Sequence, residues 1–207
     1  MAEHTGFTVP GLTLKKAEKV AALLQDRLNA LNDLQLTLKH AHWNVVGPNF
    51  IGVHTMLDDQ IVGVRAILDE IAERIATLGV APVGTPGALV RDRTWDDYDV
   101  LRADALEHLA ALDHVYAGII GDFRTAIERT HEIDPVSEDL LTGQTGQLEK
   151  YHWFIRAHLE DSSGSLSTRG TSTERSAAKK ATKRAKSRRS SCSRAWAGTW
   201  SRRTLGR

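Results

Sequence analysis

Apolar residues recur along the first 160 residues of the chain at alternating steps of three and four positions. This spacing places them on one face of an α-helix and leaves the other face polar. The pattern predicts four long helices, over residues 13–43, 50–78, 95–131 and 135–160. The apolar positions are Leu24, Leu28, Leu31, Leu34, Leu38 and Ala41; Leu57, Ile61, Val64, Leu68, Ile71, Ile75 and Leu78; Leu109, Leu112, Tyr116, Ile119, Phe123 and Ile127; and Leu141, Leu148, Tyr151 and Ile155.

Helix breakers separate these stretches. Gly47-Pro48-Asn49 follows the first helix, and Gly79 is a natural C-terminal stop for the second. Asp134-Pro135 supplies an N-cap and a proline at the first position of the fourth helix. The connection over residues 80–93 is rich in glycine and proline, and it is long enough to cross a bundle from end to end.

Four long helices, with no run of alternating apolar and polar residues, predict an all-α protein. The expected architecture is a ferritin-like four-helix bundle with a long crossover loop between helices two and three. We expect this bundle domain to occupy residues 1–161. Residues 162–207 are rich in Ser, Thr, Ala, Lys and Arg, with almost no apolar stripe, and are expected to form a disordered basic C-terminal tail.

Charge is divided in the same way as the apolar pattern. Residues 1–168 hold 14 Lys and Arg against 25 Asp and Glu, a net charge of −11, whereas residues 169–207 hold 13 against 1, a net charge of +12. The formal net charge of +1 therefore describes neither part. An acidic body with a basic tail points to a polyanionic partner for the tail.

Composition excludes several classes of protein. The chain has 207 residues, of which 41% are hydrophobic, enough to build a core. No apolar run approaches the ~20 residues of a membrane span. The first ten residues lack the basic start and apolar stretch of a secretory signal, and the single cysteine, Cys192, excludes an internal disulfide. We therefore expect a cytoplasmic protein without a membrane partner.

Four residues of ligand type lie together on the second predicted helix. His54 and Asp58 are four positions apart, as are Asp69 and Glu73, so each pair shares a face. Asp58 and Asp69 are separated by about three full turns, so all four lie on one strip beside the apolar stripe. Single acidic pairs of this kind are usually only solvated. For four such residues about one centre, the spacing alone leaves a solvated face and an ion-binding role as equal alternatives.

One chain cannot bring these four side chains to a single ion. His54 and Glu73 are ~28 Å apart along the helix axis. An antiparallel copy of the helix, related by a two-fold axis near residues 63 and 64, would place His54 opposite Glu73 and Asp58 opposite Asp69. Such a contact creates two identical sites, to which His42 could add a second imidazole. Mixed imidazole and carboxylate ligands suit Fe(II) better than structural zinc.

The stretch His42-Trp43-Asn44-Val45-Val46-Gly47-Pro48-Asn49-Phe50, with the downstream strip and the segment Ala72-Glu73-Arg74, resembles the Dps family of the ferritin superfamily. The resemblance covers roughly residues 7–160, and the basic tail is similar to that of actinobacterial forms. It implies a hollow homo-dodecamer with ferroxidase centres at two-fold interfaces. In such a centre His42, His54 and Asp58 would come from one chain, and Asp69 and Glu73 from its partner.

The resemblance also implies a chemistry. Fe(II) would be oxidised at the interface, preferentially by hydrogen peroxide, and ferric iron stored as a mineral inside the shell. Trp43 would be a nearby electron donor; the alternative is packing at the helix end. We expect Lys39 to be solvated, with a supporting contact to the site as the alternative. Glu149 and His152 have the spacing of a di-iron motif within a bundle, but without a second such pair we expect them to be structural or surface residues.

Seven cationic residues of the tail fall within an eleven-residue stretch: Lys179, Lys180, Lys183, Arg184, Lys186, Arg188 and Arg189. Mobile cations that follow phosphates are typical of sequence-independent binding to double-stranded DNA. We therefore predict a nucleoid-associated protein; alternatively, the tail only neutralises its own acidic body. The competing function is an architectural DNA-compacting protein whose metal sites are inactive or structural.

Overall fold

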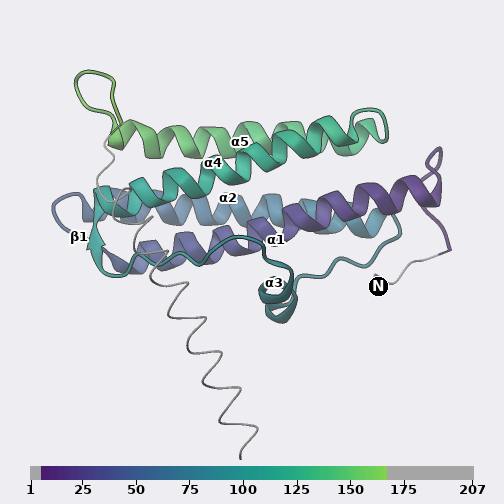
Figure 1. Ribbon diagram of the computed structural model, residues 1–207, viewed down its shortest axis with the longest axis horizontal. Helices are drawn as coiled ribbons and strands as arrows, with labels where there is room; N and C mark the ends of the chain where they lie inside the picture. The colour runs from purple at the N-terminus through teal and green to yellow at the C-terminus, as the bar shows by residue number, and fades with distance from the viewer. Residues whose placement is uncertain (1–5, 167–207) are drawn as a thin grey trace, which may run out of the picture. The chain divides into compact units, whose positions relative to one another are not determined.

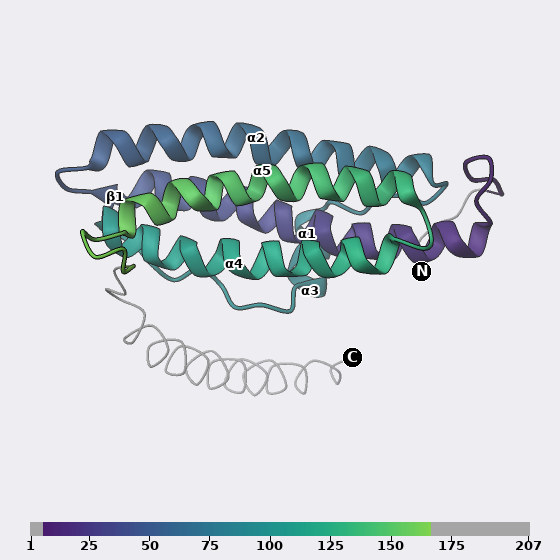
Figure 2. The same cartoon turned by 90° about the horizontal axis from the view of Figure 1, so that it is seen from above.

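The computed structural model describes residues 6–166, which form a bundle of four long helices (Figures 1 and 2). The long helices are α1 (Leu14–Asn44), α2 (Phe50–Thr77), α4 (Ala105–Thr130) and α5 (Pro135–Leu159). Short turns join α1 to α2 and α4 to α5, whereas the chain between α2 and α4 runs back along the bundle (Figure 1). The predicted four-helix bundle with a long crossover is confirmed.

The tail is largely outside this description. Residues 1–5 and 167–207 lie beyond the described part, and with them the seven predicted DNA-binding residues Lys179, Lys180, Lys183, Arg184, Lys186, Arg188 and Arg189. Residues 162–166 form a turn that brings Leu166 back to Glu160 in an isolated antiparallel bridge. The domain boundary at residue 161 stays a prediction.

None of the described helices combines the length and the apolar content that a membrane crossing requires.

The apolar stripes form the core, as predicted. Most of their members are almost fully buried, including Leu24, Leu57, Leu109 and Leu148 at 0–2% exposure. Four members are only partly buried and pack at the edge of this core: Leu68, Ile119, Ile127 and Tyr151. On α2 the neighbouring Ile67, at 6% exposure, is more deeply buried than Leu68.

The start of the third long helix was predicted wrongly. It begins at Ala105, not at Trp95, and Asp104 is its N-cap, with Oδ1 accepting a hydrogen bond from the backbone N–H of Glu107 at 3.0 Å. Trp95 belongs to the crossover and donates its indole N–H to Asp33 on α1 at 2.7 Å. The residues from Trp95 to the N-cap are therefore part of the crossover and not of the helix.

Two further elements of the connections were not anticipated. The crossover contains a short helix, α3 (Pro86–Asp92), which begins with proline in its first turn. Two-residue strands, β1 (Val45–Val46) and β2 (Ala103–Asp104), pair in parallel, with Val45 opposite Ala103 and Val46 opposite Asp104. Strands of two residues are too short to show alternation. They tie the end of α1 to the start of α4.

The predicted start and stop signals of α2 and α5 are confirmed. Gly79 follows α2 with a φ of +83°, and Pro135 opens α5 after the N-cap Asp134. Asp134 has a second role, because its carboxylate accepts a hydrogen bond from Arg74 of α2 at 2.7 Å. Ser137 completes this joint by accepting from Arg74 Nε at 2.9 Å. The far end of the bundle is therefore held by a partly buried ion pair.

Candidate metal centre

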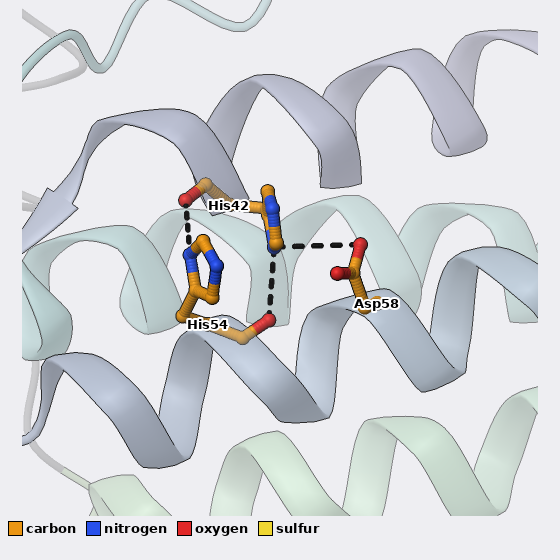
Figure 3. Close-up of side chains that lie close together, drawn as sticks. All are labelled: His42, His54 and Asp58. Atoms are coloured by element: carbon orange, nitrogen blue, oxygen red, sulfur yellow. Dashed lines mark hydrogen bonds and ion pairs between the residues drawn. The ribbon is translucent and has the colours of Figure 1, made fainter.

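Three of the predicted ligands lie together where α1 ends and α2 begins. Gly47, with a φ of +100°, reverses the chain between these helices in a conformation that residues with a Cβ rarely adopt. His42 of α1 and His54 and Asp58 of α2 thereby face one another (Figure 3). Their candidate ligand atoms all lie within 4.8 Å of one another. Among residues 6–166, no other group of three or more His, Cys, Asp or Glu side chains is this compact.

The two histidines are held by reciprocal hydrogen bonds to the backbone. His42 Nδ1 lies 2.9 Å from the His54 carbonyl oxygen, and His54 Nδ1 lies 2.9 Å from the His42 carbonyl oxygen. The rings stack with centroids 3.6 Å apart. Because a carbonyl oxygen only accepts hydrogen bonds, each Nδ1 must carry the proton. In the neutral ring the Nε2 lone pair is then available for a metal, an orientation by outer contacts that is common in metal sites.

Lys39 contacts the third residue of the group, contrary to the expectation that it is solvated. Its ammonium donates to Asp58 Oδ1 at 2.6 Å. This hydrogen bond is the largest influence that lowers the pKa of Asp58, and the nearby His42 adds to it. Asp58 is therefore ionised, and one of its two carboxylate oxygens accepts a hydrogen bond from the Lys39 ammonium.

Trp43 lies beside the group but points away from the core. Its side chain is 70% exposed, so the described residues of its own chain cover little of the ring. The alternative of packing at the helix end is therefore wrong for the single chain. The aromatic ring that contacts His54 from the start of α2 is that of Phe50, with ring centroids 4.8 Å apart. An exposed tryptophan next to a compact ligand group leaves its ring open to a second chain or to an oxidant.

Asp69 and Glu73 do not join the group within one chain. Both are exposed on α2, and Asp69 lies ~16 Å along the helix axis from Asp58. The single chain therefore presents three candidate ligands together, and the other two residues of the α2 strip lie farther along the helix.

Comparisons with known proteins identify the family. The ferritin-like domain family matches residues 21–164. The DNA protection during starvation protein of Mycolicibacterium smegmatis is 60% identical over 177 residues, which are 86% of this chain and 97% of the relative. The chain belongs to the Dps family of ferritin-like proteins.

Solved Dps structures share the fold. The Mycobacterium smegmatis Dps tetragonal form superposes with a TM-score of 0.77 at 61% identity, covering 78% of this chain and 98% of that one. DpsA14 from Streptomyces coelicolor gives a TM-score of 0.79 at 54% identity, covering 81% and 100%. The resemblance inferred from the sequence and the ferritin-like fold are both confirmed.

The spaced pair Glu149 and His152 does not form a site within this Dps-family bundle. Glu149 accepts a hydrogen bond from Arg124 at 2.9 Å, whereas His152 Nε2 lies 2.6 Å from Asp113 Oδ1. Burial lowers the pKa of His152, although Asp113 opposes this effect. The two side chains have separate protein partners, in agreement with the structural role expected for them.

Proposed function

We propose that this chain is the subunit of a shell that oxidises Fe(II) and stores ferric iron. The observation that carries this proposal is the compact group of His42, His54 and Asp58 with both Nδ1 atoms committed to backbone carbonyls. Two imidazole nitrogens and a carboxylate are ligands that suit Fe(II). Iron is here the substrate and the cargo.

A second copy of the chain completes the site. Three ligands from one protein leave coordination positions open, and Asp69 and Glu73 of the other copy would fill them if the two α2 helices pair antiparallel. Exposed apolar residues accompany this strip: Val62, which helical spacing places on the same side of α2, is 70% exposed, and Leu36 of α1 is 59% exposed. Large exposed apolar side chains around a polar strip favour a homomeric contact. We expect six such pairs to build the dodecameric shell of the family.

The proposed reaction uses hydrogen peroxide as the two-electron oxidant. Each of two ferrous ions gives up one electron, and the peroxide is reduced to water with uptake of two protons. Carboxylate ligands favour the ferric state and so lower the reduction potential. Paired oxidation avoids the one-electron cleavage that would release hydroxyl radicals. Trp43, exposed beside His42, would act as an electron donor to stray oxidant.

The ligand assignment is tested by replacing two ligands at once. His54→Ala with Asp58→Ala should reduce the initial rate of peroxide-dependent Fe(II) oxidation at least a hundredfold. Asp59→Ala is the matched control, because Asp59 is the adjacent, exposed acid of the same helix. Light scattering on each preparation checks that the particle remains assembled. Oxidation at the parent rate in an intact double variant would show that these residues do not hold the substrate.

The basic tail is proposed to bind double-stranded DNA without sequence preference. Support comes from the net charge of +12 after residue 168 and from the cluster Lys179, Lys180, Lys183, Arg184, Lys186, Arg188 and Arg189. Many tails on one shell would add avidity. This interaction would place the protein at the nucleoid and shield DNA from oxidative damage.

Truncation after Thr168 tests the tail and separates the two functions. The truncated particle should lose retardation of DNA at ~0.15 M salt while it oxidises Fe(II) at the parent rate. The variant His54→Ala with Asp58→Ala should still retard DNA and should no longer oxidise Fe(II). A parent particle that compacts DNA but does not oxidise Fe(II) would favour an architectural protein with inactive metal sites.

A further inference from the structure

The turn of α1 that carries His42 is also held by the end of the crossover, residues 98–104. Val45 and Val46 of β1 pair with Ala103 and Asp104 of β2 immediately after the helix ends. One half-turn before His42, His40 Nε2 lies 2.9 Å from the Val100 carbonyl oxygen, to which it must donate. The crossover therefore contacts α1 on both sides of the candidate ligand.

Tyr98 links this contact to α4. Its ring meets the His40 ring edge to face, with centroids 5.8 Å apart. Its hydroxyl lies 2.9 Å from His108 Nδ1 and 3.4 Å from the His108 carbonyl oxygen. His108 is completely buried in the first turns of α4. The contacts that lead from the end of α1 through His40 and Tyr98 thus end on a fully buried side chain of α4.

We propose that Tyr98 is a positioning residue for the metal site, acting through His40 to fix the end of α1 and with it the His42 imidazole. This inference rests on the proposed function, since it assigns a role in the same site. Tyr98 does not belong to the ligand group, and the sequence offered no signal for its role.

The reciprocal histidine bonds explain why a small displacement of α1 would matter. The His42 carbonyl holds His54, and the His54 carbonyl holds His42, so a shift at the end of α1 moves both imidazoles. Metal and catalytic sites lose affinity and rate when supporting contacts let ligands drift by a fraction of an ångström to an ångström. Removal of an outer contact commonly weakens metal binding by ~10–100-fold.

The anchor itself is suited to a fixed role. Burial lowers the pKa of His108, and the backbone of Asn44, the last residue of α1, is the strongest group that opposes this effect. His108 is therefore neutral at physiological pH and lies close to the same end of α1.

Tyr98→Phe is the test variant, because it keeps the ring against His40 and removes only the hydroxyl that reaches His108. Ser137→Ala is the matched control: it also removes a buried hydroxyl that bonds within the bundle, but at the joint between α2 and α5. Thermal unfolding of both variants shows whether their losses of stability are similar. His40→Gln is a second test variant, because it weakens the link from the α1 side.

The readout is binding of Co(II) alone, followed by its visible absorption in the assembled full-length protein. The signal lost in His54→Ala with Asp58→Ala defines binding at the proposed site. Tyr98→Phe and His40→Gln should weaken that binding about tenfold, and Ser137→Ala should leave it within twofold. For Fe(II) oxidation, both test variants should raise KM more than they lower kcat.

The outcomes separate this inference from the proposed function. If Tyr98→Phe binds Co(II) as the Ser137→Ala control does, Tyr98 does not position the site, although ferroxidase activity can stand. If the parent binds Co(II) at the site and does not oxidise Fe(II), the proposed function fails while the Co(II) comparison still decides the role of Tyr98. Absence of Co(II) binding at the site in the parent overturns both.

Discussion

Lys39 shows how a single residue can set the behaviour of the candidate centre. Its ammonium donates to Asp58 Oδ1 at 2.6 Å, so a metal ion bound at this carboxylate would compete with the lysine for it. Sequence spacing placed Lys39 one turn before His42, but it could not tell a solvated lysine from one that reaches from α1 to Asp58 on α2. The direction of a long, flexible side chain is decided by its neighbours in space.

The first prediction concerns this lysine. Lys39→Met should lower the KM for Fe(II) about fivefold, because the ion no longer competes with the ammonium for Asp58. Initial rates measured against Fe(II) concentration check this, with the exposed Lys16→Met as control. An unchanged or higher KM in Lys39→Met would mean that the lysine supports the site and does not compete with the substrate.

The second prediction concerns pH. Burial lowers the pKa of His108 and of His152 below their ordinary value of 6.5, so the unfolded chain binds protons that the folded chain resists. Stability should therefore fall as the pH drops through about 6.5 and level off below the folded-state pKa values. Exposed His131, whose pKa is raised mainly by its hydrogen bond to Glu138, opposes this trend.

Urea unfolding at a series of pH values between 7.5 and 5.5 measures the slope. His108→Gln should reduce the dependence of the free energy of unfolding on pH. His131→Asn should increase this dependence. A parent protein whose stability rises on acidification over this range would contradict the account of the buried histidines. Depressed carboxylate pKa values, such as that of Asp134, contribute only below about 3.8, outside this window.

At the scale of the elements, the long helices were predictable and the connections were not. The apolar stripes repeat over many turns, so an error of one residue matters little, and their core positions are confirmed. Residues 95–104 were wrongly predicted to be helical. They belong to the crossover, where contacts with α1 such as that of Trp95 with Asp33 decide their conformation. Such long-range contacts have no local period.

A third prediction concerns the contact between α2 and α5. A Cβ added at Gly63 would lie 1.8 Å from the Tyr151 hydroxyl oxygen and 2.8 Å from its ring carbon Cζ. Gly63→Ala should therefore lower the free energy of unfolding by about 1–3 kcal/mol, through overpacking. Gly143→Ala on α5 meets open space and should instead stabilise by about 0.5–1 kcal/mol, through helix propensity.

Chemical denaturation of both glycine variants gives the comparison. Tyr151→Leu should restore most of the stability lost in Gly63→Ala, because it removes the ring tip and the hydroxyl. If Gly63→Ala is as stable as Gly143→Ala, then α2 and α5 do not approach as closely as the structure has them.

At the scale of the whole molecule, the sequence carried information about symmetry that a single chain does not display. His54, Asp58, Asp69 and Glu73 are spaced about one centre, and the structure leaves the last two exposed and far from the ligand group. The charge division between body and tail was equally plain from the sequence. The contacts that Lys39, Tyr98 and His108 make near the ligand group were not plain from the sequence, because they depend on how three separate segments pack.

The central claim is that each site draws its ligands from two chains. Two inactive variants test it when they are produced together in one cell: His54→Ala with Asp58→Ala in one chain, and Asp69→Asn with Glu73→Gln in the other. Each mixed pair would contain one interface site with all its ligands and one with neither set.

The measurement is peroxide-dependent Fe(II) oxidation by the purified mixed particles. With random pairing of equal amounts, about a quarter of the sites should be intact, so activity should return to about a quarter of the parent rate while each variant alone stays inactive. Mixed particles no more active than the separate variants, or full activity in the Asp69→Asn with Glu73→Gln particle, would contradict a site shared between two chains.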